Sequence, residues 1–149
     1  MDANELTARV LFNGQTLMMP RFESDAYRFV AELQQTDARL LVLSFLEDAS
    51  HQPVHEAVFA RMLPRVPEKN ASVIYTNQPS IDPNVLQSLA NTTHVLLCGV
   101  ALARTETKLY QSAQVGHVNV LLTEGIERID ADPALKKTMW TAWMKQFGV

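Results

Sequence analysis

Four short apolar runs recur along the chain and limit the fold classes that it can adopt. They occupy residues 39–45, 71–76, 94–100 and 118–122, and each is almost continuously apolar. Runs of this length and character are typical of strands that are buried on both faces of a parallel sheet. Helical patterns lie between most of them, as the crossover connections of a parallel sheet require. The alternation predicts a doubly wound or three-layer α/β fold with a mostly parallel sheet of four strands or slightly more.

Capping residues and apolar spacing predict three helices before the fourth run. One begins at Ser24-Asp25, one at Pro53 and a short one at Asp82-Pro83, where a proline or an oxygen-bearing side chain suits the first turn. The first helix is expected to carry Ala26, Phe29, Val30 and Leu33 on its inner side. The second carries Val54, Ala57, Val58, Arg61 and Met62 on one side and ends at Pro64. The short third helix carries Val85, Leu86 and Leu89. A polar stretch, residues 103–116, leads to the fourth run.

Length and composition indicate an ordinary globular protein. At 149 residues the chain is expected to fold as one α/β domain with its own core. Its 13 basic and 16 acidic side chains give a net charge of −3, which argues against broad electrostatic capture of nucleic acid or of an anionic membrane. The single cysteine, Cys98, excludes an internal disulfide and is expected to be buried and inert, because it lies inside the third apolar run.

The first twenty residues admit two interpretations. Asn13-Gly14 between apolar runs favours a hairpin with a type I′ turn, and the rival is an extended arm that orders only on a partner. The N-terminus lacks the basic and apolar regions of a signal peptide, and no apolar stretch approaches the roughly 18–20 residues of a membrane span. A cytoplasmic location is therefore expected.

The last helix carries the strongest local pattern. Asp132 is placed to cap its first free N–H groups, Pro133 fits the first helical position and Gly148 is expected to end it. A helix that covers a small core needs an apolar arc roughly 100° wide, and this one is wider. The surplus predicts contact with a partner. One apolar stripe is Leu135, Met139, Ala142 and Trp143, and beside it lie Trp140, Met144 and Phe147.

Acidic residues follow two of the predicted strands, at the sheet edge where α/β proteins usually bind ligands. Glu47 and Asp48 follow the first run and Glu124 follows the fourth, which makes them candidates for a general base or a cation site. The simpler interpretation is that they cap helices and solvate loops. No glycine-rich phosphate loop follows any run.

Other chemistry-bearing residues form no complete site in the sequence. His51 and His55 approach a zinc-ligand spacing, but Pro53 places His51 outside the helix and no Cys or His pair nearby completes a tetrahedral site. Ser44 and Ser72 lie within strands, not on the sharp strand-to-helix turn that a hydrolase nucleophile needs. We therefore predict no catalytic residue, no cofactor and no metal.

The stretch from Thr123 to Trp140 resembles the closing segment of the psi subunits of bacterial DNA polymerase III, small accessory proteins of the clamp loader. The family pattern is two spaced aliphatic residues, a polar gap, Asp or Asn before Pro, a basic residue, and an aliphatic residue before Trp. This chain has Ile126, Ile129, Asp132-Pro133, Lys136 and Met139-Trp140 at these places. A weaker similarity relates residues 39–43, with Pro53-Val54, Val58 and Leu63, to the family's first core strand and following helix.

The resemblance implies a three-layer fold similar to that of uracil-DNA glycosylases. It also implies a non-catalytic adaptor that joins the chi subunit to the clamp loader in DNA replication, without sequence-specific binding of nucleic acid. An active glycosylase is disfavoured, because residues 46–51 do not match the water-positioning loop of those enzymes. The chain departs from the family at its start, where Leu6, Val10, Leu11 and Phe12 replace a leucine-rich segment that usually contains tryptophan.

Partner-binding residues are accordingly predicted on the last helix and in the first segment. They are Trp140, Trp143, Met144, Phe147, Leu11 and Phe12. The helical wheel puts Trp143 deeper and Trp140 nearer the edge, so Trp140 is the better candidate for contact. Two alternatives remain open: a small enzyme or nucleotide binder that uses Glu47, Asp48 and Glu124, and a homodimer with the last helix as its seam.

Overall fold

The computed structural model describes residues 21–106 and 108–147, and the chain divides into two compact units, Met1–Gln35 and Thr36–Val149. The described part of the first unit is helix α2, Arg21–Gln34. It contains the predicted helical positions Phe29, Val30 and Leu33 and begins three residues before the predicted Ser24. The predicted hairpin or arm, with Leu11 and Phe12, lies outside the described residues.

The second unit is built on a five-stranded sheet in the order β2-β1-β4-β7-β6. Four strands run parallel: β1 (Leu40–Phe45), β2 (Ala71–Thr76), β4 (His94–Cys98) and β7 (Val118–Thr123). The fifth, β6 (Ser112–Val115), is antiparallel to β7. The predicted α/β fold with a mostly parallel sheet is confirmed, and the four apolar runs are the four parallel strands.

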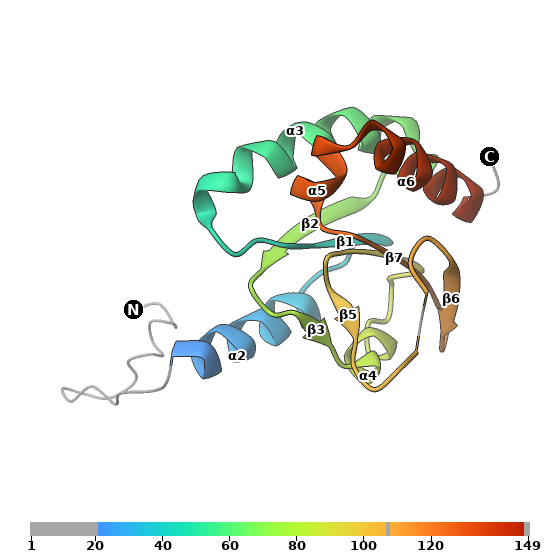
Figure 1. The fold of residues 1–149 in the computed structure, drawn as a ribbon. Helices are drawn as coiled ribbons and strands as arrows, with labels where there is room; N and C mark the ends of the chain where they lie inside the picture. The colour runs from blue at the N-terminus through green and yellow to red at the C-terminus, as the bar shows by residue number, and fades with distance from the viewer. Residues whose placement is uncertain (1–20, 107, 148–149) are drawn as a thin grey trace, which may run out of the picture. The chain divides into compact units, whose positions relative to one another are not determined.

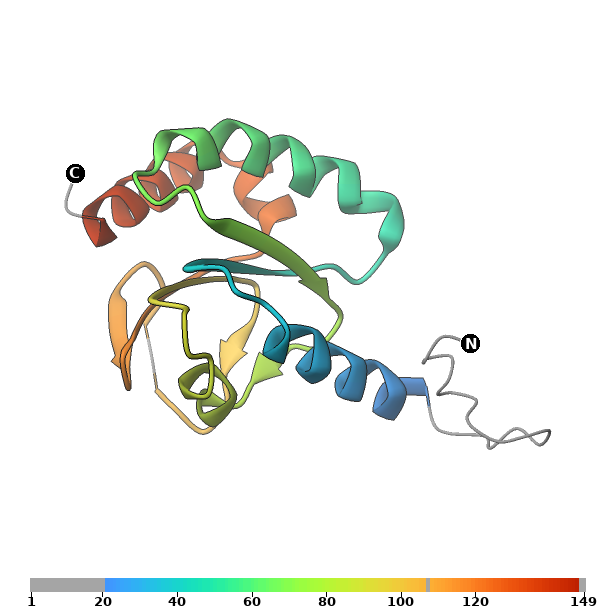
Figure 2. The ribbon, with the colours of Figure 1, turned by 180° about the vertical axis from the view of Figure 1, so that it is seen from behind.

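Helices flank this sheet, which explains why its central strands β1 and β4 are almost entirely apolar. On one face lie α3 (Gln52–Met62), α5 (Ile126–Ala131) and α6 (Pro133–Gln146) (Figure 1). On the other face lie α4 (Pro83–Gln87) and a two-stranded sheet of β3 (Ser80–Ile81) and β5 (Ala101–Leu102), as Figure 2 shows from behind. Among the described residues, no helix is both long and apolar enough to cross a membrane.

The core beneath α3, α5 and α6 collects apolar side chains from every one of these elements. The central strands supply fully buried aliphatic residues, and the helices supply aliphatic, sulfur-containing and aromatic ones. Its members from the strands include Leu40, Val42, Leu96, Cys98 and Leu121, and those from the helices are Val58, Phe59, Met62, Ile126, Ile129, Met139 and Trp143.

The side of helix α3 that faces the core differs from the side that the sequence predicts. Its buried residues are His55, Val58, Phe59 and Met62, whereas Val54 is 36% exposed. The expectation that Val54, Ala57 and Arg61 face inward is therefore wrong. Burial of the larger Phe59 gains more than burial of Val54, and His55 is tolerated inside because polar partners receive it.

Several short elements are absent from the sequence predictions, and β6 and α5 are the two that join the main sheet and its helical layer. β6 lies in the stretch expected to be a polar loop, and it is an edge strand in which only Val115 is buried. It joins β7 through Gly116, whose φ of +61° suits the tight turn. Helix α5 has only six residues and follows β7 almost directly.

Gly99 permits a close approach at the carboxyl edge of the sheet. Its φ is +76°, and a Cβ at this position would lie 3.1 Å from both the Cα of Gly125 and the Cβ of Phe45. Only glycine combines this backbone conformation with that proximity at low cost. The residue thereby lets the end of β4 pack against the turn that leads into α5.

Candidate functional site

Helix α6 is positioned by the residues that mark its start. Asp132 has an extended backbone (φ −131°, ψ 108°), and its Oδ1 accepts a hydrogen bond from the Ala134 N–H at 3.0 Å. Pro133 follows in the first turn, as predicted. Because α5 ends at Ala131, the two helices form a continuous α5–α6 segment with the Asp132 cap between them. The predicted end at Gly148 lies outside the described residues.

Trp143 belongs to the core. Its side chain is fully buried, and its ring centroid lies 6.4 Å from that of Phe147. The indole N–H finds no hydrogen-bond partner in the described part of the chain. Such an unsatisfied donor costs about 1–3 kcal/mol, which the packing of the ring must outweigh. This placement agrees with the deeper position on the helical wheel and removes Trp143 from the surface that a partner can reach.

Trp140, Met144 and Phe147 form a partly buried row that we term the α6 strip. Their spacing of four and three residues places them along one side of the helix. The guanidinium carbon of Arg65 lies 5.4 Å from the centroid of the Trp140 ring, a cation–π distance. The His94 ring stacks on Phe147 with centroids 4.7 Å apart. Both contacts hold aromatic side chains in place at the surface.

A small cleft lies directly beside Trp140. It has a volume of about 160 Å³, and its apolar walls come from α3, α5 and α6. Charged side chains frame it: Asp130 lies 3.7 Å from Arg61 and 3.6 Å from Lys136. Interface hot spots commonly lie in well-packed apolar pockets from which water is excluded.

The acidic residues predicted at the sheet edge separate into two places. Glu47 and Asp48 line an open depression of about 710 Å³. Glu124 pairs with Arg128 at 2.6 Å and is not part of its lining. Asp48 caps the 3-10 turn Ala49–His51 by accepting a hydrogen bond from the Ser50 N–H, which lowers the pKa of its carboxyl. The three carboxylates therefore do not converge in one pocket.

A chain of polar contacts that sequence reasoning missed runs inward from the same depression. The Nδ1 of His55 lies 2.7 Å from the Ser44 hydroxyl, within hydrogen-bond distance. The other ring nitrogen, Nε2, lies 3.0 Å from Oε2 of Glu127. The same carboxylate oxygen lies 3.1 Å from Nδ1 of His51. The contacts therefore join β1, α3 and α5 through Ser44, His55 and Glu127.

This chain has the connectivity of a serine–histidine–carboxylate relay but not its accessibility. A nucleophilic hydroxyl must reach its substrate, whereas Ser44 and His55 are both fully buried. The arrangement instead pairs the Ser44 hydroxyl with Nδ1 of His55 inside the core, while Nε2 lies near Glu127 without hydrogen-bond geometry among the described residues. Desolvation raises the pKa of Glu127, but the contact with His55 and the proximity of His51 outweigh it, so the net pKa of this carboxyl is lowered.

Neither the histidine pair nor the cysteine forms a reactive centre. No group of three or more His, Cys, Asp or Glu within residues 21–106 and 108–147 is arranged to hold a metal ion. Cys98 is buried, as predicted, and burial raises the pKa of its thiol to about 12. Since the thiolate is the nucleophilic form, Cys98 is chemically inert at neutral pH.

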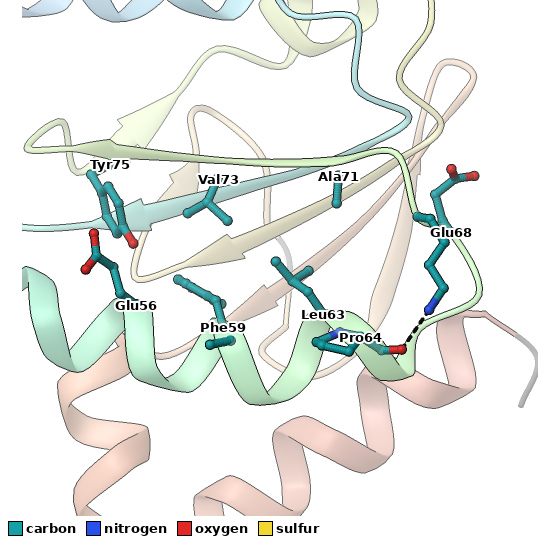
Figure 3. Close-up of a pocket in the computed structure, with 10 residues that line it drawn as sticks. Glu56, Phe59, Leu63, Pro64, Glu68, Ala71, Val73 and Tyr75 are labelled. Atoms are coloured by element: carbon teal, nitrogen blue, oxygen red, sulfur yellow. Dashed lines mark hydrogen bonds between the residues drawn. The ribbon is translucent and has the colours of Figure 1, made fainter.

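A second surface, the α3–β2 groove, lies between α3 and the edge strand β2 (Figure 3). Its volume is about 480 Å³ and most of its lining is apolar. Its lining residues are Glu56, Phe59, Ala60, Leu63, Pro64, Glu68, Lys69, Ala71, Val73 and Tyr75. Figure 3 shows Glu56 beside Tyr75 at one end and Glu68 beside Ala71 at the other. Its signal in the sequence was weak, because it requires the edge position of β2 to be known.

Comparison of the sequence with known protein families and with curated proteins gives no match. The resemblance to psi subunits therefore stays an expectation from the motif residues of the sequence.

Proposed function

We propose that this protein is a non-catalytic adaptor of the DNA replication machinery, which links the chi subunit to the clamp loader of DNA polymerase III. The three-layer architecture of the uracil-DNA glycosylase type is part of the same proposal. A mostly parallel five-stranded sheet with helices on its faces agrees with that architecture. The cytoplasm is the compartment that this role requires.

The observation that supports the proposal most strongly is that the residues of the motif differ in burial. Ile126, Ile129 and Met139 are buried and fix the α5–α6 segment on the sheet. Trp140, the last residue of the motif, stays at the surface beside Arg65 and an apolar cleft. Trp140 is half-buried and packs at the margin of the core, so part of its ring stays open to a partner, and tryptophan anchors commonly dominate interfaces.

Ordered surroundings favour this role for Trp140. Its ring is held against Arg65, so little side-chain freedom is left to lose when a partner covers it. Met144 and Phe147 extend the apolar contact along the same side of α6. The α6 strip thus offers a central anchor with adaptable neighbours, and Met tolerates irregular partner surfaces.

The test is binding of the full chain to purified chi and clamp-loader subunits from the same organism, measured by calorimetry. Wild type is expected to bind, and Trp140→Ala is expected to weaken one of the two affinities by at least about tenfold, the value of a hot-spot residue. Thr141→Ala is the matched control, because Thr141 is exposed on the adjacent position of the same helix. No binding by wild type, or equal binding by Trp140→Ala, would overturn the proposal.

A further inference from the structure

The open edge of the sheet at β2 is distinct from the α6 strip. β2 is the first strand in the sheet order, and within the described residues no strand pairs with its outer side. The α3–β2 groove runs beside this edge. An exposed edge strand next to an apolar groove is a template for a further strand.

The backbone geometry of β2 defines which groups are free to pair. The carbonyl oxygens of Asn70 and Thr76 accept hydrogen bonds from the N–H groups of Leu40 at 3.1 Å and Leu46 at 2.7 Å, on the β1 side. Successive residues of a strand direct their backbone groups to opposite edges. The backbone N–H and C=O groups of Val73 and Tyr75 therefore face the open edge.

The side chains of the same odd-numbered residues face α3. Figure 3 shows Ala71, Val73 and Tyr75 directed toward the helix, and all three are half-buried. The residues whose backbone is free to pair are thus also those that line the groove. A strand that adds to this edge would complete the sheet and cover the groove in one step.

We propose that two copies of this chain pair through β2 as antiparallel strands, with a twofold axis at Val73. A twofold axis perpendicular to the sheet keeps each face on its own side, so residues that face α3 oppose residues that face α3. Val73 then lies opposite Val73 of the second copy, and Ala71 lies opposite Tyr75. The small alanine leaves room for the tyrosine ring.

This register also matches the free backbone groups. The N–H groups of Val73 and Tyr75 donate to the carbonyls of Val73 and Ala71 in the second copy. The Ala71 N–H is already bonded to the Lys69 carbonyl at 3.1 Å and is not required. The α3 helices of the two copies lie side by side over the axis, where the exposed Ala60 and Pro64 leave little bulk.

Charges at the two ends of the groove are complementary under this symmetry. Glu56 lies at the Tyr75 end and accepts a hydrogen bond from Gln52 at 3.0 Å, and Lys69 lies at the Ala71 end and donates one to the Pro64 carbonyl at 2.6 Å. Neither charge is in an ion pair within the described part of the chain. The antiparallel arrangement brings Glu56 of each copy to Lys69 of the other. Glu68, at the same end as Lys69, is held by Arg39 at 3.3 Å and by the Asn70 N–H at 3.0 Å.

Sedimentation velocity of the purified full chain over a concentration series tests the proposal. Wild type is expected to dimerise, and Glu56→Lys or Lys69→Glu to weaken dimerisation severalfold. The combined Glu56→Lys and Lys69→Glu variant is expected to restore it, because the pair is exchanged and not lost. Glu106→Lys is the control: this exposed residue precedes β6, at the opposite edge of the sheet.

Amide hydrogen exchange identifies the surface that pairs. The N–H groups of Val73 and Tyr75 are expected to exchange more slowly as protein concentration rises, while those of the other edge strand, β6, do not change. A chain that stays monomeric throughout, or a dimer that leaves these amides unprotected, would overturn the proposal. Because only the purified chain is used, such a failure leaves the adaptor function to be judged by its own binding experiment.

Discussion

Replacement of Trp143 by alanine is expected to lower the free energy of unfolding by about 3–5 kcal/mol, the usual range for a large aromatic residue in a core. The side chain is fully buried among residues from the sheet, α3 and α5, so the neighbours have little freedom to fill the cavity. The indole N–H has no hydrogen-bond partner among the described residues, and its removal recovers about 1 kcal/mol, the low end of the cost of an unsatisfied donor. The lower half of the range is therefore expected.

The companion variant Trp140→Ala should cost far less. Trp140 is only partly buried, and its contact with Arg65 contributes about 0.5–1 kcal/mol as an exposed cation–π pair. With partial loss of packing, the expected total is about 1–2 kcal/mol.

Urea unfolding followed by circular dichroism measures both losses. With a slope of about 2 kcal/mol per molar urea, Trp143→Ala lowers the midpoint by about 1.5–2 M and Trp140→Ala by about 0.5–1 M. Equal losses for the two variants would refute the assignment of Trp140 to the surface. A loss below about 1 kcal/mol for Trp143→Ala would refute the core packing of α6.

Two further predictions concern the polar chain and the glycine at the sheet edge. Because the pKa of Glu127 is lowered from its ordinary value of 4.5, the contact of this carboxylate with His55 stabilises the fold above pH 4.5. This stabilisation is lost as the pH falls below 4.5 toward the lowered pKa. Urea unfolding should therefore show that the difference in free energy of unfolding between wild type and Glu127→Gln shrinks as the pH is lowered below 4.5. Gly99→Ala should cost about 2–4 kcal/mol in thermal unfolding, because φ is +76° and the new Cβ meets backbone. Gly125→Ala, whose Cβ would meet nothing within 4 Å, should cost less than about 1 kcal/mol.

The strands could be predicted from the sequence because both of their faces are covered. A strand buried on two sides is apolar at almost every position, so residues 40–43 and 95–98, all fully buried, stand out without knowledge of their neighbours. The start of α6 could be predicted for a different reason: capping by Asp132 is local and needs only the next two residues.

The polar chain could not be predicted in the same way. Ser44, His55 and Glu127 come from three elements, and nothing local to any one of them indicates the other two. The rotation of α3 follows from the same contacts, since His55 is buried only because its partners exist. The α3–β2 groove likewise depends on the strand order, which places β2 at the edge of the sheet.

The condition of Cys98 makes the protein a convenient host for site-specific probes. The only thiol in the chain is buried and has a pKa near 12, so maleimide reagents at neutral pH leave the native protein unmodified. A cysteine introduced at an exposed position then carries the label alone, with no need to mutate the core. Dyes attached in this way at Glu56 or Thr141 would report separately on the edge of the sheet and on the last helix, in the same unaltered fold.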